Sequence, residues 1–159
     1  MLIFLFNNFW IVLIFIICIN ALILKLQSKK YIADNPALKK GYNQLFKGFL
    51  FYANIPWIIM GIGNLSSCTK SILDYFNPHS QNYFVLGFYF SIFFIWVLGT
   101  KWIYFKNGAA FLENHPGVLR GEKFGSKNNT TAIQIKIVWG ILSIVLCVRV
   151  IIYFLYYLP

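Results

Sequence analysis

Glu113 and His115 are an acid and an imidazole only two residues apart in this 159-residue sequence. Such a pair is able to exchange protons with a substrate, and with ligands from elsewhere it is able to hold a metal ion. The structural alternative places Glu113 on a helix surface near Lys106 and Arg120. It places His115 in the turn before Pro116. We expect the structural alternative. Glu113 and His115 remain the candidate site of an enzyme, should the protein be one.

Signatures of other chemistries are missing from the sequence. The three cysteines, Cys18, Cys68 and Cys147, form no Cys-x-x-Cys pair, which argues against thiol oxidation. There is also no glycine-rich phosphate loop followed by Lys and Ser or Thr, and no Gly-x-Ser-x-Gly motif. We therefore expect no cofactor, and the sequence argues against an enzyme.

The elements that position these residues are strongly apolar. Hydrophobic residues make up 59% of the chain, charged residues 11%, and the mean hydropathy is +0.67, which excludes an ordinary soluble domain. Crossing a bilayer takes about 20 apolar residues, and four segments qualify: 2–24, 46–65, 83–105 and 137–158. They are too long and too continuously apolar for barrel strands. We predict an all-α, integral membrane four-helix bundle, formed as one four-pass domain over 1–159.

Basic residues predict the orientation of this bundle. The first connection carries Lys25, Lys29, Lys30, Lys39, Lys40 and Lys47, and the third carries Lys101, Lys106, Arg120, Lys123, Lys127 and Lys136. The middle connection has only Lys70. Because basic residues stay on the cytoplasmic side, we expect cytoplasmic loops at 25–45 and 106–136 and both termini outside. This also separates His79 from His115 across the bilayer, so no metal is expected.

The net charge of +10 follows from the same distribution. Topology and attraction to anionic headgroups at the cytoplasmic face account for twelve of the fourteen basic residues. No basic stripe interleaved with aromatic residues accompanies them. We therefore expect the lipid bilayer as a partner and no nucleic acid.

Four polar residues inside the spans are candidates for a layer near mid-membrane. At 1.5 Å per residue, Arg149 lies about 13 Å from the outer surface. The same arithmetic places Asn8, Asn54 and Ser91 at depths of about 9, 16 and 12 Å. Converging helix faces would let these three accept hydrogen bonds from the guanidinium.

Arg149 has three interpretations, since a guanidinium in lipid costs at least a few kcal/mol when it lacks partners. It reaches the outer headgroups beside Tyr153 and Tyr156, or it belongs to a structural hydrogen-bond layer, or it binds a ligand or anion. In the last two cases Pro56 adds an acceptor, because it has no N–H to bond the carbonyl of Tyr52.

Small residues predict where the helices approach each other closely. On the last span they share one face, nearly opposite Arg149, so either both faces are enclosed or one meets another subunit or protein. Packing is also the interpretation we favour on two other spans, the alternative being a cleft open to the outer leaflet. The groups are Gly140, Ser143 and Cys147 on the last span, Asn54, Ile58, Gly61 and Leu65 on the second, and Gly87 and Ser91 on the third.

The connections contain short elements of their own. In the first, Asp34 or Asn35 caps a short basic helix lying on the headgroups. The middle connection has a short interfacial segment at 72–76. The third has a short helix over 107–114, stopped by a turn, and then a mobile stretch at 121–129.

Short motifs in and around the second and third spans resemble small multi-pass bacterial membrane proteins with no established activity. The resemblance covers about half of the chain and implies a bacterial inner membrane, but it carries no mechanism. Its motifs are Ala53-Asn54-Ile55-Pro56-Trp57, Met60-Gly61-Ile62-Gly63, Asp74-Tyr75-Phe76-Asn77-Pro78, Trp102-Ile103-Tyr104-Phe105, Asn107-Gly108-Ala109-Ala110 and His115-Pro116-Gly117.

The sequence therefore predicts a non-enzymatic integral membrane protein with a structural, assembly or partner-binding role. Its partners would be anionic headgroups and a second copy of the chain or another membrane protein. One alternative is a small transporter, or a binder of lipid or an anionic ligand, that uses Arg149 with Asn54 and Ser91. Another is a membrane enzyme with Glu113 and His115 at the cytoplasmic interface.

Overall fold

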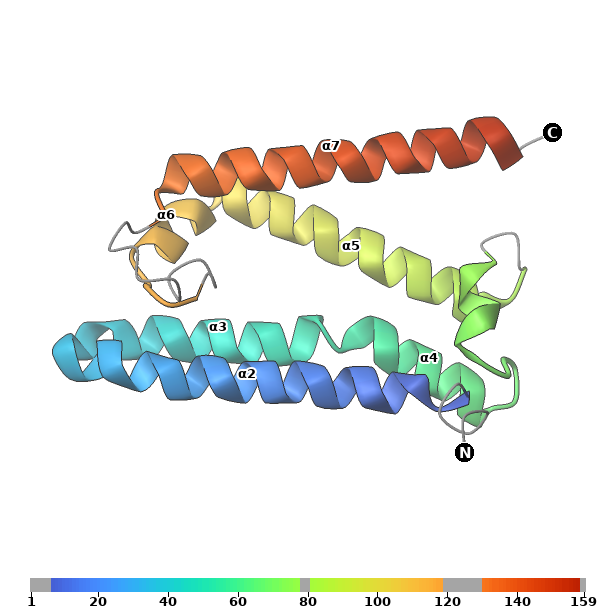
Figure 1. Ribbon diagram of the computed structural model, residues 1–159, viewed down its shortest axis with the longest axis horizontal. Coiled ribbons are helices and arrows are strands. Elements are labelled where there is room, and N and C mark those ends of the chain that lie inside the picture. Colours follow the sequence, from blue (N-terminus) through green and yellow to red (C-terminus); the bar gives the residue numbers. More distant parts are fainter. Residues whose placement is uncertain (1–6, 78–80, 119–129, 158–159) are drawn as a thin grey trace. The chain divides into compact units, whose positions relative to one another are not determined.

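The computed structural model describes residues 7–77, 81–118 and 130–157, and its regular secondary structure there is entirely helical (Figure 1). Four helical segments are long and apolar enough to cross a membrane: Phe9–Asp34, Pro36–Leu65, Tyr83–Phe105 and Ala132–Arg149. The predicted all-α class and the four membrane-spanning segments are confirmed. The chain is a multi-pass integral membrane protein.

The chain divides into two compact units, Met1–Leu98 and Gly99–Pro159. The first unit contains the segments Phe9–Asp34 and Pro36–Leu65, most of Tyr83–Phe105, and a short segment between the last two. The second begins within the last of these long segments and continues to the end of the chain.

Helix α2 (Phe9–Asp34) extends well past residue 24, the predicted end of the first span. Residues 25–34 include four charged side chains, but Lys, Leu, Gln and Ala among them favour a helix, and no glycine or proline interrupts them. Asn35 then adopts an extended conformation, and its side chain accepts a 3.2 Å hydrogen bond from the N–H of Ala37. The predicted cap is therefore confirmed at Asn35, where the 3-10 helix η1 (Pro36–Leu38) begins.

The chain returns beside α2 as two helices, α3 (Lys39–Tyr52) and α4 (Ile55–Leu65) (Figure 1). The expected loop over 25–45 is thus mostly helical. The break between α3 and α4 has a local cause, because Pro56 cannot donate a hydrogen bond to the carbonyl one turn earlier.

Gly61 packs closely, as the small-residue pattern predicts. A Cβ atom at Gly61 would lie only 2.7 Å from a ring carbon of Trp10 on α2. Asn54 on the same predicted face is also buried, whereas Ile58 and Leu65 are exposed. On the next span Gly87 is less crowded, since a Cβ atom there would lie 3.6 Å from the side chain of Ile59.

A compact segment at 66–77 joins α4 to α5 (Tyr83–Phe105) and contains the 3-10 helix η2 (Ile72–Phe76). The short segment expected at 72–76 is confirmed as helical. Tyr75 anchors it, because its side chain is buried in a core with Met60, Val85 and Phe88. The Tyr75 hydroxyl lies 3.3 Å from the carbonyl oxygen of Met60, to which it donates.

The second unit joins the end of α5 to α6 (Gly108–Glu113) and α7 (Ala132–Tyr157). Helix α6 lies within the short helix predicted at 107–114. Helix α7 starts before residue 137, the predicted beginning of the last span. The cause is a reciprocal cap in which the backbone N–H of Thr131 and of Gln134 each donates to the other's side chain, at 3.0 and 3.3 Å.

Contacts between the end of α5 and the start of α7 involve two aromatic side chains. Trp139 packs against Gly99 and donates a 3.0 Å hydrogen bond from Nε1 to the Thr100 hydroxyl. The Tyr104 hydroxyl donates to the carbonyl of Lys136 at 2.7 Å. The predicted mobile stretch at 121–129 and residue 158, the end of the predicted fourth span, lie outside the described residues.

Candidate functional site

The end of α2, η1 and the start of α3 form a helical hairpin over residues 25–47, here called the basic hairpin. Small and aromatic side chains join its two helices, with Ser28, Gly41 and Tyr42 buried. The rings of Tyr31 and Tyr42 stack with 6.4 Å between their centroids. These contacts give the basic hairpin a defined packing face, and its six lysines are exposed.

Lys25 marks the level at which the basic hairpin meets the apolar spans. Its ammonium lies 5.1 Å from the centroid of the Phe46 ring, a cation–π contact between α2 and α3. The residues before Lys25 and after Lys47 are mostly apolar. The helical residues 25–34 therefore project about 14 Å beyond this level, at 1.5 Å per residue.

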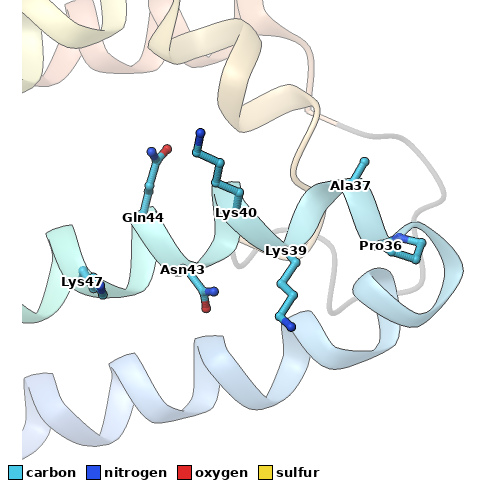
Figure 2. Close-up of a pocket in the computed structure, with 7 residues that line it drawn as sticks. All are labelled: Pro36, Ala37, Lys39, Lys40, Asn43, Gln44 and Lys47. Carbon is cyan, nitrogen blue, oxygen red and sulfur yellow. The ribbon is translucent and has the colours of Figure 1, made fainter.

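A hollow of about 510 Å³ lies along the α3 side of the basic hairpin (Figure 2). It is lined by Pro36, Ala37, Lys39, Lys40, Asn43, Gln44 and Lys47. Three lysines and two amides thus face it, and no acidic residue is among these lining residues. The basic hairpin holds six lysines but only one acid, Asp34. This composition favours an anionic ligand.

Helical spacing explains how one helix lines the hollow. At about 100° per residue, the lysines and amides of α3 fall within an arc of about 140°. Figure 2 shows Lys39 and Asn43 on one side of α3 and Lys40 and Gln44 on the other, with Lys47 further along the helix. Gly41 and Tyr42, which pack toward α2, lie opposite this arc.

Asn54 occupies the break between α3 and α4, and it is buried, with 6% of its surface exposed. Its Nδ2 donates a 2.7 Å hydrogen bond to the carbonyl of Leu50, near the end of α3. Its Oδ1 is buried and has no hydrogen-bond partner among the described residues. Asn54 is therefore a structural donor to Leu50 that also carries an unused acceptor.

The other neutral members of the predicted polar layer make local contacts. Ser91 on α5 is buried, and its hydroxyl donates to the carbonyl of Phe88 at 2.7 Å. Asn8 is half-buried at the start of α2. Since Asn54 bonds to Leu50 and Ser91 to Phe88, the two candidate side chains do not hydrogen-bond to each other.

Arg149 belongs to the second unit and is exposed on α7. Its neighbour Cys147, on the predicted small-residue face, is exposed as well. On that face Gly140 packs closely, since a Cβ atom there would lie 3.0 Å from the Tyr104 hydroxyl. The side chains of Tyr153 and Tyr156 lie outside the described part of α7.

His115 has a structural role at the end of α6. The imidazole is buried, with 7% exposed, and stacks on the ring of Phe111 with 4.1 Å between centroids. Its Nδ1 donates to the carbonyl of Phe111 at 2.6 Å, one helical turn earlier. Glu113 is half-buried nearby. The local contacts of His115 match the turn interpretation, and Gly117 continues the turn with a φ of 78°.

Metal binding finds no support in the described ranges 7–77, 81–118 and 130–157. They contain no cluster of three or more His, Cys, Asp or Glu side chains that could hold a metal ion. His79 lies outside these ranges.

We compared the chain with protein-family models, curated proteins and solved structures. None of the three comparisons gave a match. Among the described residues, the basic hairpin forms the most complete candidate binding site.

Proposed function

We propose that this chain is a non-enzymatic protein of the bacterial inner membrane with a partner-binding role. In this proposal both termini lie outside and the basic hairpin lies in the cytoplasm, where it binds anionic lipid headgroups. The positions of the lysines support the orientation.

The hollow lined by Lys39, Lys40 and Lys47 is the observation that carries the proposal. It begins near the level of the Lys25–Phe46 contact, where the apolar spans end and headgroups would start. Each lysine near an anionic membrane surface contributes about 1 kcal/mol of attraction. An anionic headgroup that reaches all three lysines would therefore bind up to roughly 100-fold more tightly, and one that reaches fewer would gain proportionately less.

The experiment that tests this proposal measures lipid binding to the full chain purified in detergent. The unfolding midpoint is recorded with added phosphatidylglycerol, which is anionic, and with phosphatidylcholine, which is zwitterionic. We expect phosphatidylglycerol alone to raise the midpoint, because a ligand that binds only the folded state stabilises it. Replacing Lys39, Lys40 and Lys47 together by Gln should remove most of this increase.

A matched control removes the same charge from the third connection, with Lys101, Lys106 and Lys136 each replaced by Gln. These three lysines are exposed and line no part of the hollow. The control should retain most of the phosphatidylglycerol effect. Equal losses in the two triple variants would contradict a site at the basic hairpin and leave only a general effect of charge.

Asn54 favours a second candidate, the binding or transport of a small polar ligand within the membrane. Its buried acceptor lacks a partner among the described residues, and it lies at a helix break, where transporters commonly place ligand sites. Arg149 is a second residue to which this candidate function assigns ligand binding, and it would be substituted separately. The Asn54 variants described in the Discussion distinguish a ligand role from a structural one.

A further inference from the structure

We infer that the hollow binds a lipid headgroup bearing a terminal phosphate in addition to its phosphodiester. This inference rests on the proposed function, because it requires the basic hairpin to meet the cytoplasmic leaflet. It goes further by naming the class of headgroup and assigning each of its two phosphates to different lysines.

The lysines of the hollow occur at two levels along α3. Lys39 and Lys40 are adjacent in its first turn, whereas Lys47 lies about two turns later. At 1.5 Å per residue this separation is about 10–12 Å along the helix axis. One phosphate is too small to meet both levels, but two phosphates joined by a short polyol linker would reach toward both.

The direction of this separation matters as much as its length. Lys47 follows Phe46, whose ring contacts Lys25 at the level where the apolar spans begin. In a hairpin that stands on the membrane, Lys47 therefore lies near the phosphodiesters, and Lys39 and Lys40 lie further into the cytoplasm. A terminal phosphate, attached beyond the phosphodiester, would occupy that more distant level.

The charges of the two levels match the charges of the two groups. A phosphodiester carries one negative charge, whereas a phosphomonoester carries about −1.5 to −2 at pH 7. The level near the membrane offers Lys47. The level further into the cytoplasm offers Lys39 and Lys40. Between the levels, Asn43 and Gln44 supply amide donors that suit the oxygens of the linker.

Three lipids test the inference by native mass spectrometry of the full chain in detergent. Phosphatidylglycerol has one phosphodiester, and phosphatidylglycerol phosphate differs from it only by a terminal phosphate. Cardiolipin has two phosphodiesters and no terminal phosphate. We expect phosphatidylglycerol phosphate to bind about 30-fold more tightly than phosphatidylglycerol, from two additional lysines. Cardiolipin should show no comparable preference.

Variants then assign the two levels. Replacing Lys39 and Lys40 by Gln should abolish the preference for the terminal phosphate while leaving phosphatidylglycerol binding nearly unchanged. Replacing Lys47 by Gln should weaken the binding of phosphatidylglycerol and of phosphatidylglycerol phosphate by the same factor. Far-ultraviolet circular dichroism of each variant verifies that the helices are intact.

The outcomes separate this inference from the function on which it rests. Equal binding of phosphatidylglycerol and its phosphate would overturn the inference, although selectivity for both over phosphatidylcholine would still support the proposed function. Tighter binding of cardiolipin than of phosphatidylglycerol phosphate would also overturn it. Binding of phosphatidylcholine as tight as that of either anionic lipid would contradict both proposals.

Discussion

The ammonium of Lys25 lies 5.1 Å from the centre of the Phe46 ring, and this contact sets α2 beside α3 at one level. On one side of that level both helices continue as apolar spans. On the other side they continue as a packed hairpin with lysines around its exposed faces. The contact therefore relates the membrane boundary to the hollow, and the proposed binding of headgroups depends on it.

Replacing Gly61 by Ala should destabilise the first unit. The new Cβ would lie 2.7 Å from the Trp10 ring. Because the ring is rigid, the whole side chain or the helix would have to move. Overpacking of this kind costs about 1–3 kcal/mol. Thermal unfolding in detergent measures the change. Gly48→Ala is the matched control, because its nearest neighbour is 4.0 Å away and alanine favours a helix by up to about 1 kcal/mol. Equal effects of the two changes would contradict the close packing.

Two substitutions at Asn54 separate its hydrogen bond to Leu50 from its amide oxygen Oδ1, because a serine hydroxyl can donate but its oxygen lies closer to the backbone than Oδ1. Asn54→Leu removes both and should cost about 1 kcal/mol, because the Leu50 carbonyl loses its 2.7 Å partner. Asn54→Ser keeps a donor able to reach a carbonyl one turn earlier, so it should recover most of the unfolding free energy. A folded Asn54→Ser protein that fails to complement a deletion strain would instead assign the acceptor to a ligand.

The unfolding free energy should fall at alkaline pH because of Tyr75. Burial raises the pKa of its hydroxyl above the ordinary value of 10.0; the hydrogen bond with Thr69 opposes this shift, and the charge of Asp74 adds to it. A group whose pKa is higher in the folded state stabilises the protein fully below its unfolded pKa, and this contribution is lost as the pH rises through the folded pKa. The loss therefore begins above about pH 10.

Tyr75→Phe provides the control for this pH dependence. Without the hydroxyl, the protein loses the bonds with Met60 and Thr69 at neutral pH, at a cost of about 1–2 kcal/mol. Its unfolding midpoint should then vary less between about pH 9 and 11, around the ordinary tyrosine pKa, than that of the unmodified chain. The same slope in both proteins would show that another group causes the alkaline loss.

His115→Ala and Glu113→Ala should have different effects. His115 is buried, stacks on Phe111 and bonds to its carbonyl, so its removal should cost about 1–3 kcal/mol. Glu113→Ala should change the unfolding free energy by no more than about 0.5 kcal/mol. We also expect Glu113→Ala to complement a deletion strain. Failure to do so in a folded protein would support the enzymatic alternative.

Hydropathy predicts some elements of this fold fully and others only in part. The predicted third span has the bounds of α5, because polar residues flank it on both sides, and the side chain of Asn82 caps it by accepting from the N–H of Phe84. The predicted first span ends near Lys25, where the apolar residues end, but helix α2 continues to Asp34. Helix propensity does not depend on hydropathy, so the polar residues that follow continue the helix.

The candidate site shows a similar division. The sequence reveals the lysines of the basic hairpin, but the hollow depends on which face of α3 packs against α2. The spacing of Ser28 with Tyr31, and the pair Gly41 and Tyr42, are the available signal for that face. Depth arithmetic predicts Asn54 and Ser91 at similar levels in the membrane, but it does not give side-chain direction, and each of them bonds within its own segment.

Site-directed labelling measures most directly whether the basic hairpin lies in the cytoplasm. Cys18 and Cys147 are replaced by Ala, Ala37 at the hollow becomes Cys, and the native exposed Cys68 is retained as an internal reference. The same chain without the Ala37 change provides the baseline for a membrane-impermeant maleimide. In spheroplasts we expect Cys68 alone to react, and position 37 to react only after permeabilisation. Labelling at position 37 in intact spheroplasts, with Cys68 protected, would contradict the proposed orientation and the binding of cytoplasmic headgroups.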